Sequence, residues 1–325
     1  MRLRSLLKRP AYLVLLTISD LADFFRYLRY ASILAFYDSD RKLEALIRKD
    51  NHRIEKGLAL PEPRPWFGES VLARLCANLA RYSRAVSPNS MLLDESAAVV
   101  NEYEAAFKAG AVPPASVARS IRTIRDILGT RAPFEAGTVM LEKGRLQNAA
   151  AFDFELFAKS RFSVRSFAGT PIPEEVVGRA VRVATKTPSV CNRCAWRVYN
   201  VVEPTTLERV LACQNGNSGF GHTCGNVLVV CADLRCFEGG GERNQAYVDG
   251  GLFAMSLVYA LHGNGVASCF LNWSADYFQD AKLRDVLSIP GNEVIVTLVA
   301  IGGYPDALRV AVSPRPPVDE VLVTI

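Results

Sequence analysis

Segments able to form β-strands are confined to the second half of this 325-residue chain. Residues 1–150 carry apolar side chains at helical spacing, interrupted by prolines, and we identify no strand among them. Farther along, β-branched runs at 196–202, 227–232 and 293–301 alternate with helix-length segments. Such alternation favours helices on both faces of one sheet. We therefore predict an α+β fold, an α/β/α sandwich with a mixed sheet, preceded by an α-helical region.

The same contrast predicts two domains. Residues 1–150 form a helical extension that serves as a lid, a dimer arm or a membrane-proximal segment. Residues 151–325 form the domain that carries the chemistry. The segment 318–325 is rich in valine, and we expect a terminal strand there. Because this strand has no hairpin partner in the sequence, we expect it to pair elsewhere, including with another subunit.

Composition excludes several classes of function. The net charge of +5 comes from scattered basic residues, and no nucleic-acid-binding motif is present, so we predict no nucleic-acid partner. The eight cysteines lack the dense spacing of a secreted scaffold, which indicates a reducing, cytoplasmic compartment. Cys191 and Cys194 form one C-x-x-C pair, but no second pair follows and only three histidines exist. We predict no metal site and leave a redox disulfide open.

The first 30 residues predict an amphipathic helix. A basic segment, 1–9, precedes an apolar run at 11–18 that is far too short to span a membrane. The run resembles part of a signal peptide, but the small-residue cleavage site is missing. Apolar residues then continue at helical spacing. We expect this helix to cover the core or a dimer interface. The second hypothesis is peripheral contact of residues 1–30 with the inner face of the membrane.

A candidate anion site lies in the heptapeptide Arg161–Phe167. In an extended segment, Arg161, Ser163 and Arg165 project to the same side. Two guanidinium groups and a hydroxyl on one side suit a phosphate or a similar dianion. The alternative interpretation is a solvated basic edge.

Motifs of several common cofactor sites are absent from the sequence. We find no G-x-G-x-x-G after a strand, no P-loop and no G-x-S-x-G. The candidate polar residues are arginines and amides, accompanied by the close-packing glycines Gly250 and Gly251 and by Trp273. Paired glycines inside a helix indicate that another helix or a flat ligand packs closely. This combination favours a flat, phosphorylated cofactor that supplies the reactive chemistry itself.

Three segments together resemble the FMN-dependent nitroreductase family. Arg161–Phe167 is similar to the R-x-S-x-R-x-F opening of that family, and Pro188–Trp196 is similar to its P-S-x-x-N-x-Q-P-W segment. Ile301–Pro305, followed by Arg315, is similar to its G-Y-P segment and late basic residue. The order and spacing agree, and the resemblance covers roughly residues 155–325.

The resemblance implies an intertwined homodimer with FMN at the interface. It also implies a ping-pong reaction in which NAD(P)H reduces FMN and an unidentified small-molecule acceptor takes the electrons. No side chain need act as an acid or base, and we name none. Ser189 and Asn192 would approach the flavin of the second subunit. The implied FMN-binding residues are Arg161, Phe162, Ser163, Arg165, Ser189, Asn192, Asn217, Leu271, Asn272, Trp273 and Arg315.

The chain departs from the family pattern in two ways. Cys194-Ala195 stands where the family has Gln-Pro, and Phe220 stands where a basic residue is frequent.

The helical first half resembles an extension of bacterial nitroreductase-like proteins from polysaccharide gene clusters. The alternative function is therefore a non-catalytic flavin-binding or membrane-surface interaction protein of polysaccharide biosynthesis. Residues of the extension that we expect to reach the substrate are His52, Arg53, Glu55 and Lys56.

Overall fold

The computed structural model describes residues 2–31, 39–110 and 112–325. The first half of the described chain is helical, as predicted. Side-chain caps begin two of its helices, since Ser39 accepts a hydrogen bond from the amide of Lys42, and Asn89 from that of Leu92. The helices are α1 (Arg2–Tyr30), α2 (Asp40–Leu58), α3 (Glu69–Tyr82), α4 (Ser90–Phe107) and α5 (Ala115–Leu128).

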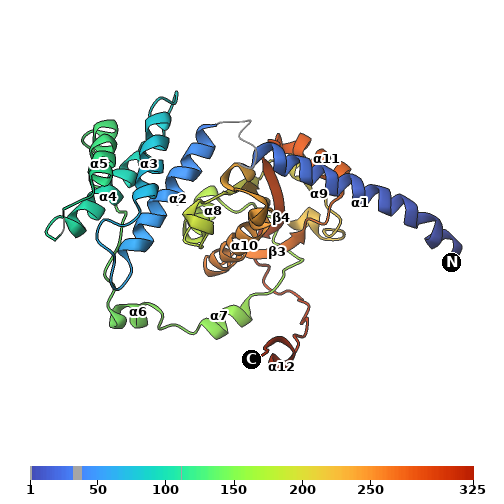
Figure 1. Cartoon of the computed structure of the whole chain (residues 1–325). Coiled ribbons are helices and arrows are strands. Elements are labelled where there is room, and N and C mark those ends of the chain that lie inside the picture. The colour runs from blue at the N-terminus through green and yellow to red at the C-terminus, as the bar shows by residue number, and fades with distance from the viewer. Residues whose placement is uncertain (1, 32–38, 111) are drawn as a thin grey trace.

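Helices α2 to α5 form a bundle with its own apolar core. Its centre holds fully buried side chains such as Leu75, Tyr82 and Tyr103. The bundle stands to one side of the sheet, and α2 runs between the two parts (Figure 1). The segment 131–160, which contains α6 (Lys143–Ala149) and α7 (Phe154–Ser160), returns along the outside to the second half.

The second half contains a four-stranded sheet with the order β1-β2-β4-β3. All neighbouring strands pair antiparallel. The α+β class is confirmed, but the mixed character of the sheet is limited among the described residues to one parallel bridge, Ser163 to Ser268. The elements are α8 (Glu174–Ala184), β1 (Trp196–Val201), α9 (Pro204–Leu211), β2 (Asn226–Asp233), α10 (Gln245–Gly263), β3 (Ala267–Asn272), α11 (Tyr277–Leu287) and β4 (Glu293–Gly302).

Helices cover both faces of the sheet. Along β2, Val227 and Val229 belong to the core that includes Leu283 of α11. Leu228 and Val230 belong to the opposite core, beneath α8 and α10. Every residue of β2 is buried, which explains why this strand reads as a continuous apolar run instead of an alternating one.

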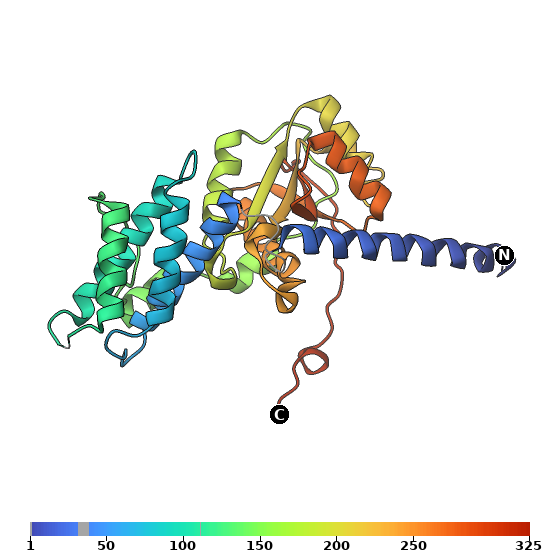
Figure 2. The same ribbon diagram turned by 45° about the horizontal axis from the view of Figure 1, so that its top comes forward.

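Helix α1 lies on α11 with its C-terminal part and extends past the rest of the molecule with its N-terminal part (Figure 2). Arg26 pairs with Asp280 at 3.0 Å, and the Ser19 hydroxyl accepts the amide of Tyr277 at 3.1 Å. The helix spans the basic first segment as well as the apolar residues after it, and it includes Pro10. None of the helices in the described part of the chain is long and apolar enough to cross a membrane.

The expected terminal strand is wrong. Residues Val318–Val321 form a short helix, α12, and the exposed residues after it form no strand. A strand requires a hydrogen-bonded neighbour, and the tail leads away from the sheet in Figure 1. Pro317 at the N-cap and two acidic residues in the first turn favour the helix locally.

Candidate functional site

The heptapeptide, α10 and the C-terminal tail line one cavity of about 560 Å³. Five residues proposed from the sequence meet there: Arg161, Phe162, Ser163, Arg165 and Arg315. The structure thus brings Arg315 to the two arginines that precede it by some 150 positions. The remaining lining residues are Ala158, Lys159, Met255, Tyr259, Ala311, Val312 and Ser313.

Backbone pairing with β3 orients this segment. The amide of Val164 donates to the carbonyl of Ser268 at 2.9 Å, beside the Ser163–Ser268 bridge. Val164 is buried in the core, so the alternating positions 161, 163 and 165 project away from it. The predicted common side of the two arginines and the serine is therefore the cavity wall.

The three arginines bring positive charge without internal compensation. Within the described chain, no carboxylate forms an ion pair with Arg161, Arg165 or Arg315. By contrast, Arg193 forms a bidentate pair with Glu242, at 2.7 and 3.0 Å. Three guanidinium groups with free donors around one cavity suit an anion such as a phosphate.

A histidine beside the cavity responds to this charge. Burial, and then the nearby Arg161, lower the pKa of His262 below its ordinary value. The Nε2 atom of His262 lies 2.8 Å from the Ser160 hydroxyl, and its Nδ1 atom lies 3.3 Å from the Tyr304 hydroxyl. The Ser160 hydroxyl donates to the carbonyl of Phe157, so His262 anchors the end of α7 just before Arg161.

The predicted amide contacts gather at the other end of β3. The Nδ2 atom of Asn217 donates to the carbonyls of Leu211 and Gln214, at 2.7 and 2.8 Å. Gln214 in turn donates to the carbonyl of Asn272 at 3.0 Å. Gln214, which our sequence analysis overlooked, therefore joins Asn217 to Asn272. Its only signal in the sequence was its place before the Asn215–Gly221 loop.

Leu271 and Trp273 face different surroundings. Leu271 is buried in the core, so it offers a ligand its backbone only. The indole nitrogen of Trp273 donates to Asp280 at 3.3 Å, and Trp273 lines a small pocket against α1. These residues lie at the end of β3, outside the set that lines the arginine cavity.

Ser189 and Asn192 belong to a separate loop. The hydroxyl of Ser189 accepts the amide of Cys194 at 3.1 Å, and Asn192 is exposed. Neither residue lines the arginine cavity of its own chain. Their assignment to the flavin of a second subunit remains a prediction.

The four proposed substrate residues lie on α2. His52 and Glu55 contact each other at 3.4 Å, and Glu55 also accepts the amide of Gly137 at 3.0 Å. Arg53 lies 3.6 Å from Asp50, and Lys56 is exposed. None of them lines the arginine cavity.

Within the described residues, no three His, Cys, Asp or Glu side chains are grouped closely enough to hold a metal ion. All eight cysteines are free. Burial raises the pKa of the Cys194 thiol, which keeps it protonated near neutral pH.

Comparison with known families agrees with the geometry. Residues 158–304 match the model of the Nitroreductase family. This segment is a nitroreductase-family domain. The match runs from the residues before Arg161 to the end of β4 and excludes the helices of the first half. Met255 and Tyr259, on α10, lie within the nitroreductase domain and line its cavity, although our sequence analysis did not single them out.

Solved structures similar to the nitroreductase domain include three bacterial proteins. The FMN-dependent nitroreductase from Clostridium difficile R20291 is 19% identical, with 48% of this chain and 90% of that chain covered and a TM-score of 0.42. The nitroreductase family protein from Streptococcus pneumoniae TIGR4 is 20% identical, with 53% and 100% covered and a TM-score of 0.46. The one from Clostridium novyi NT is 21% identical, with 48% and 87% covered and a TM-score of 0.42. No curated protein matches the chain.

Proposed function

We propose that this protein is an FMN-dependent oxidoreductase that takes hydride from NAD(P)H and passes electrons to a small-molecule acceptor. The observation that carries the proposal is the convergence of Arg161, Arg165 and Arg315 on one cavity without acidic partners among the described residues. The nitroreductase family match of residues 158–304 supports an oxidoreductase in particular.

The residues around the cavity suit FMN chemically. The arginines and the Ser163 hydroxyl would hold the phosphate, and Phe162, Met255 and Tyr259 supply apolar walls. A volume of about 560 Å³ is in the usual range for cofactor sites. From Ser163, β3 leads toward Asn272 and the Asn217 loop, whose polar groups would meet the edge of the ring system.

FMN, when bound, would supply the hydride acceptor and electron donor of a two-step, ping-pong reaction. The protein's own part is to bind and orient. The arginines would fix the phosphate end, and the end of β3 would present backbone groups to the ring. We assign no side chain a proton-transfer role.

We also propose that the protein is a homodimer. Helix α10 turns an apolar stripe outward, made by residues Val248, Leu252, Met255 and Tyr259 at helical spacing. Val248 and Leu252 are 50% and 51% exposed in the single chain. A second copy would bury this stripe and bring its own Ser189 and Asn192 to the cavity.

The location that we propose is the cytoplasm, with peripheral contact at the inner face of the membrane as a second candidate. Helix α1 supports that candidate, because Leu13, Leu21 and Phe25 are exposed on it behind a basic first segment. The corresponding measurement is flotation of the full-length protein with anionic vesicles at low salt. Absence of binding would exclude the contact.

The first test is the visible spectrum of the purified protein and its FMN affinity. The Arg161→Ala/Arg165→Ala variant should bind FMN about 100-fold or more weakly, because each lost charged hydrogen bond contributes about 1.5–3 kcal/mol. A matched control is Arg182→Ala/Arg209→Ala, which removes two exposed arginines that do not line the cavity. A wild type that cannot be loaded with FMN would refute the proposal.

Addition of NAD(P)H separates the enzyme from a non-catalytic flavin protein. An enzyme should lose its flavin absorbance without oxygen and regain it when an acceptor is added. A bound flavin that NAD(P)H leaves oxidised would favour the alternative function, an interaction protein that holds flavin without turnover.

A further inference from the structure

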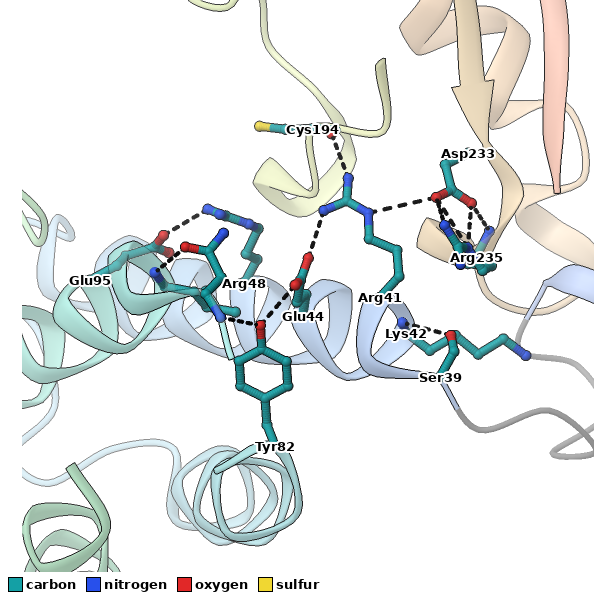
Figure 3. Close-up of polar contacts among 12 residues, drawn as sticks. Ser39, Arg41, Lys42, Glu44, Arg48, Tyr82, Glu95, Cys194, Asp233 and Arg235 are labelled. Carbon is teal, nitrogen blue, oxygen red and sulfur yellow. Dashed lines mark hydrogen bonds and ion pairs between the residues drawn. The ribbon is translucent and has the colours of Figure 1, made fainter. Parts of the chain in front are cut away.

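The helical extension reaches the loop Ser189–Cys194 through Arg41 of α2. The Nη2 atom of Arg41 donates to the carbonyl of Cys194 at 3.2 Å, and its Nη1 atom donates to Glu44 at 2.8 Å. Its Nε atom lies 3.6 Å from Asp233 at the end of β2. Figure 3 shows the guanidinium group among these three partners, which come from α2, the loop and the sheet.

Cys194, the last residue of this loop, contacts two of its other residues. Its amide donates to the Ser189 hydroxyl at 3.1 Å, and its thiol lies 3.5 Å from the carbonyl and 3.6 Å from the side-chain oxygen of Asn192. One residue therefore connects Arg41 to the two loop side chains, Ser189 and Asn192, that the proposed function assigns to the flavin.

The loop has a backbone conformation that most side chains, cysteine included, disfavour. Cys191, Asn192 and Cys194 have φ values of 50°, 53° and 48°, in the left-handed region where a Cβ atom is crowded. Three such residues within four positions need support from their surroundings. Arg193 provides part of it, because its side chain is buried, pairs with Glu242 and donates to the carbonyl of Val190 at 3.1 Å.

A second polar chain joins α2 to the other side of the loop. Lys49 forms an ion pair with Glu238. The amide of Glu238 donates to Glu242 at 2.6 Å, and Glu242 is the carboxylate that holds Arg193. The loop is thus held through Cys194 on one side and through Arg193 on the other.

Apolar packing also joins α2 to the end of this loop. Ala195 is 1% exposed and shares a core cluster with Ala45 of α2 and with Ala31. Small side chains let a helix approach a loop closely. The Cys194-Ala195 pair, which replaces the family's Gln-Pro, therefore lies where α2 packs.

The position of Arg41 depends in turn on the bundle. Glu44, its partner, accepts the hydroxyl of Tyr82 on α3 at 2.8 Å. That hydroxyl accepts the amide of Asn89, the N-cap residue of α4, at 2.8 Å. Hydrogen bonds therefore run without interruption from α4 to the loop.

We infer that α2 is a positioning element of the flavin site, and that Arg41 and Lys49 hold the loop Ser189–Cys194 in its left-handed conformation. This inference rests on the proposed function for the role of the loop. The helical extension then determines how Ser189 and Asn192 meet the flavin, and it does more than serve as a lid.

The first experiment needs no flavin. The rate at which iodoacetamide labels Cys194 is measured by mass spectrometry in the FMN-free protein. Labelling should be about tenfold faster in Arg41→Met than in the wild type, because the variant loses one charged hydrogen bond that keeps the loop closed. Arg41→Lys, which keeps the charge, should fall between. The matched control is Arg131→Met, because the Arg131 side chain is 26% exposed against 27% for Arg41 and likewise binds a backbone carbonyl, that of Leu128, and a carboxylate, that of Asp94.

The second experiment uses the loaded protein. In Arg41→Met, FMN should bind about tenfold more weakly. The visible circular dichroism of the bound flavin should also change, whereas Arg131→Met should match the wild type. Urea titration identifies loss of folding, and if Arg41→Met does not fold, Lys49→Met replaces it with the same expectations. If Arg41→Met and Lys49→Met both kept the labelling rate and the flavin dichroism of the wild type, the inference would be overturned. A wild type without flavin would refute the proposed function, while the labelling rates would still decide whether α2 holds the loop.

Discussion

Individual arginines in this protein follow two different patterns. Arg41 and Arg193 have carboxylate partners and connect parts of the fold. Arg161 and Arg165 line a cavity, and the described residues provide them with no carboxylate. A guanidinium group that is left without an internal partner remains available to an external anion. The presence or absence of an internal carboxylate therefore separates ligand-binding arginines from structural ones more clearly than their sequence context does.

His262, beside the cavity, makes the free energy of unfolding of the protein depend on pH. Its pKa in the folded protein lies below the unfolded value of 6.5, because burial and Arg161 disfavour the charged form. Its contribution to stability is therefore complete above pH 6.5 and is lost as the pH falls through the folded pKa. We expect urea denaturation to show a smaller loss of stability on mild acidification in His262→Gln than in the wild type. Equal losses in both proteins would contradict this assignment.

At the scale of elements, α10 shows why neighbouring glycines differ. A Cβ atom on Gly250 would lie 2.6 Å from a methyl group of Val296 on β4, whereas one on Gly251 would meet nothing within 4 Å. The sequence predicted that another helix or a flat ligand packs closely against both glycines. Close packing is confirmed only at Gly250, and the neighbour there is a strand. The apolar face of α10 thus packs closely against the sheet, and its outward face is the one that we propose for dimer contact.

This difference predicts opposite effects of the same substitution. Gly250→Ala should destabilise the protein by about 1–3 kcal/mol through overpacking against Val296. Gly251→Ala should stabilise it by roughly 0.5–1 kcal/mol, because alanine loses less backbone entropy in a helix. Urea denaturation midpoints measure both. Equal midpoints for the two variants would show that the approach to β4 does not limit position 250.

At the scale of the molecule, the proposed dimer depends on the outward stripe of α10. Leu252→Arg should convert the dimer to a monomer, because it places a charge in the centre of an apolar interface. Val183→Arg on α8 is the control, since Val183 is 61% exposed and does not lie on the stripe. Light scattering measures the mass. A wild-type monomer, or a dimeric Leu252→Arg, would refute the proposed interface.

Much of this architecture could be predicted from local patterns. Helical spacing and proline breaks predicted the helical first half, and β-branched runs predicted the strands, because these signals depend on side chains close in the sequence. The alternation in Arg161–Phe167 likewise predicted which side chains share one side, and the cavity lies on that side. The tail was predicted wrongly for the complementary reason, since a β-rich run forms a strand only when another strand is available to pair with it.

Other features depended on contacts that no local pattern encodes. The resemblance implied that Asn217 contacts the flavin, but its Nδ2 atom donates to the carbonyls of Leu211, at the end of α9, and Gln214. Nothing near Arg41 in the sequence indicates that it binds the carbonyl of Cys194, more than 150 residues away. The residue types of a site can be read from the sequence because chemistry selects them. Only tertiary packing decides which of their hydrogen bonds remain free and which distant helix holds them in place.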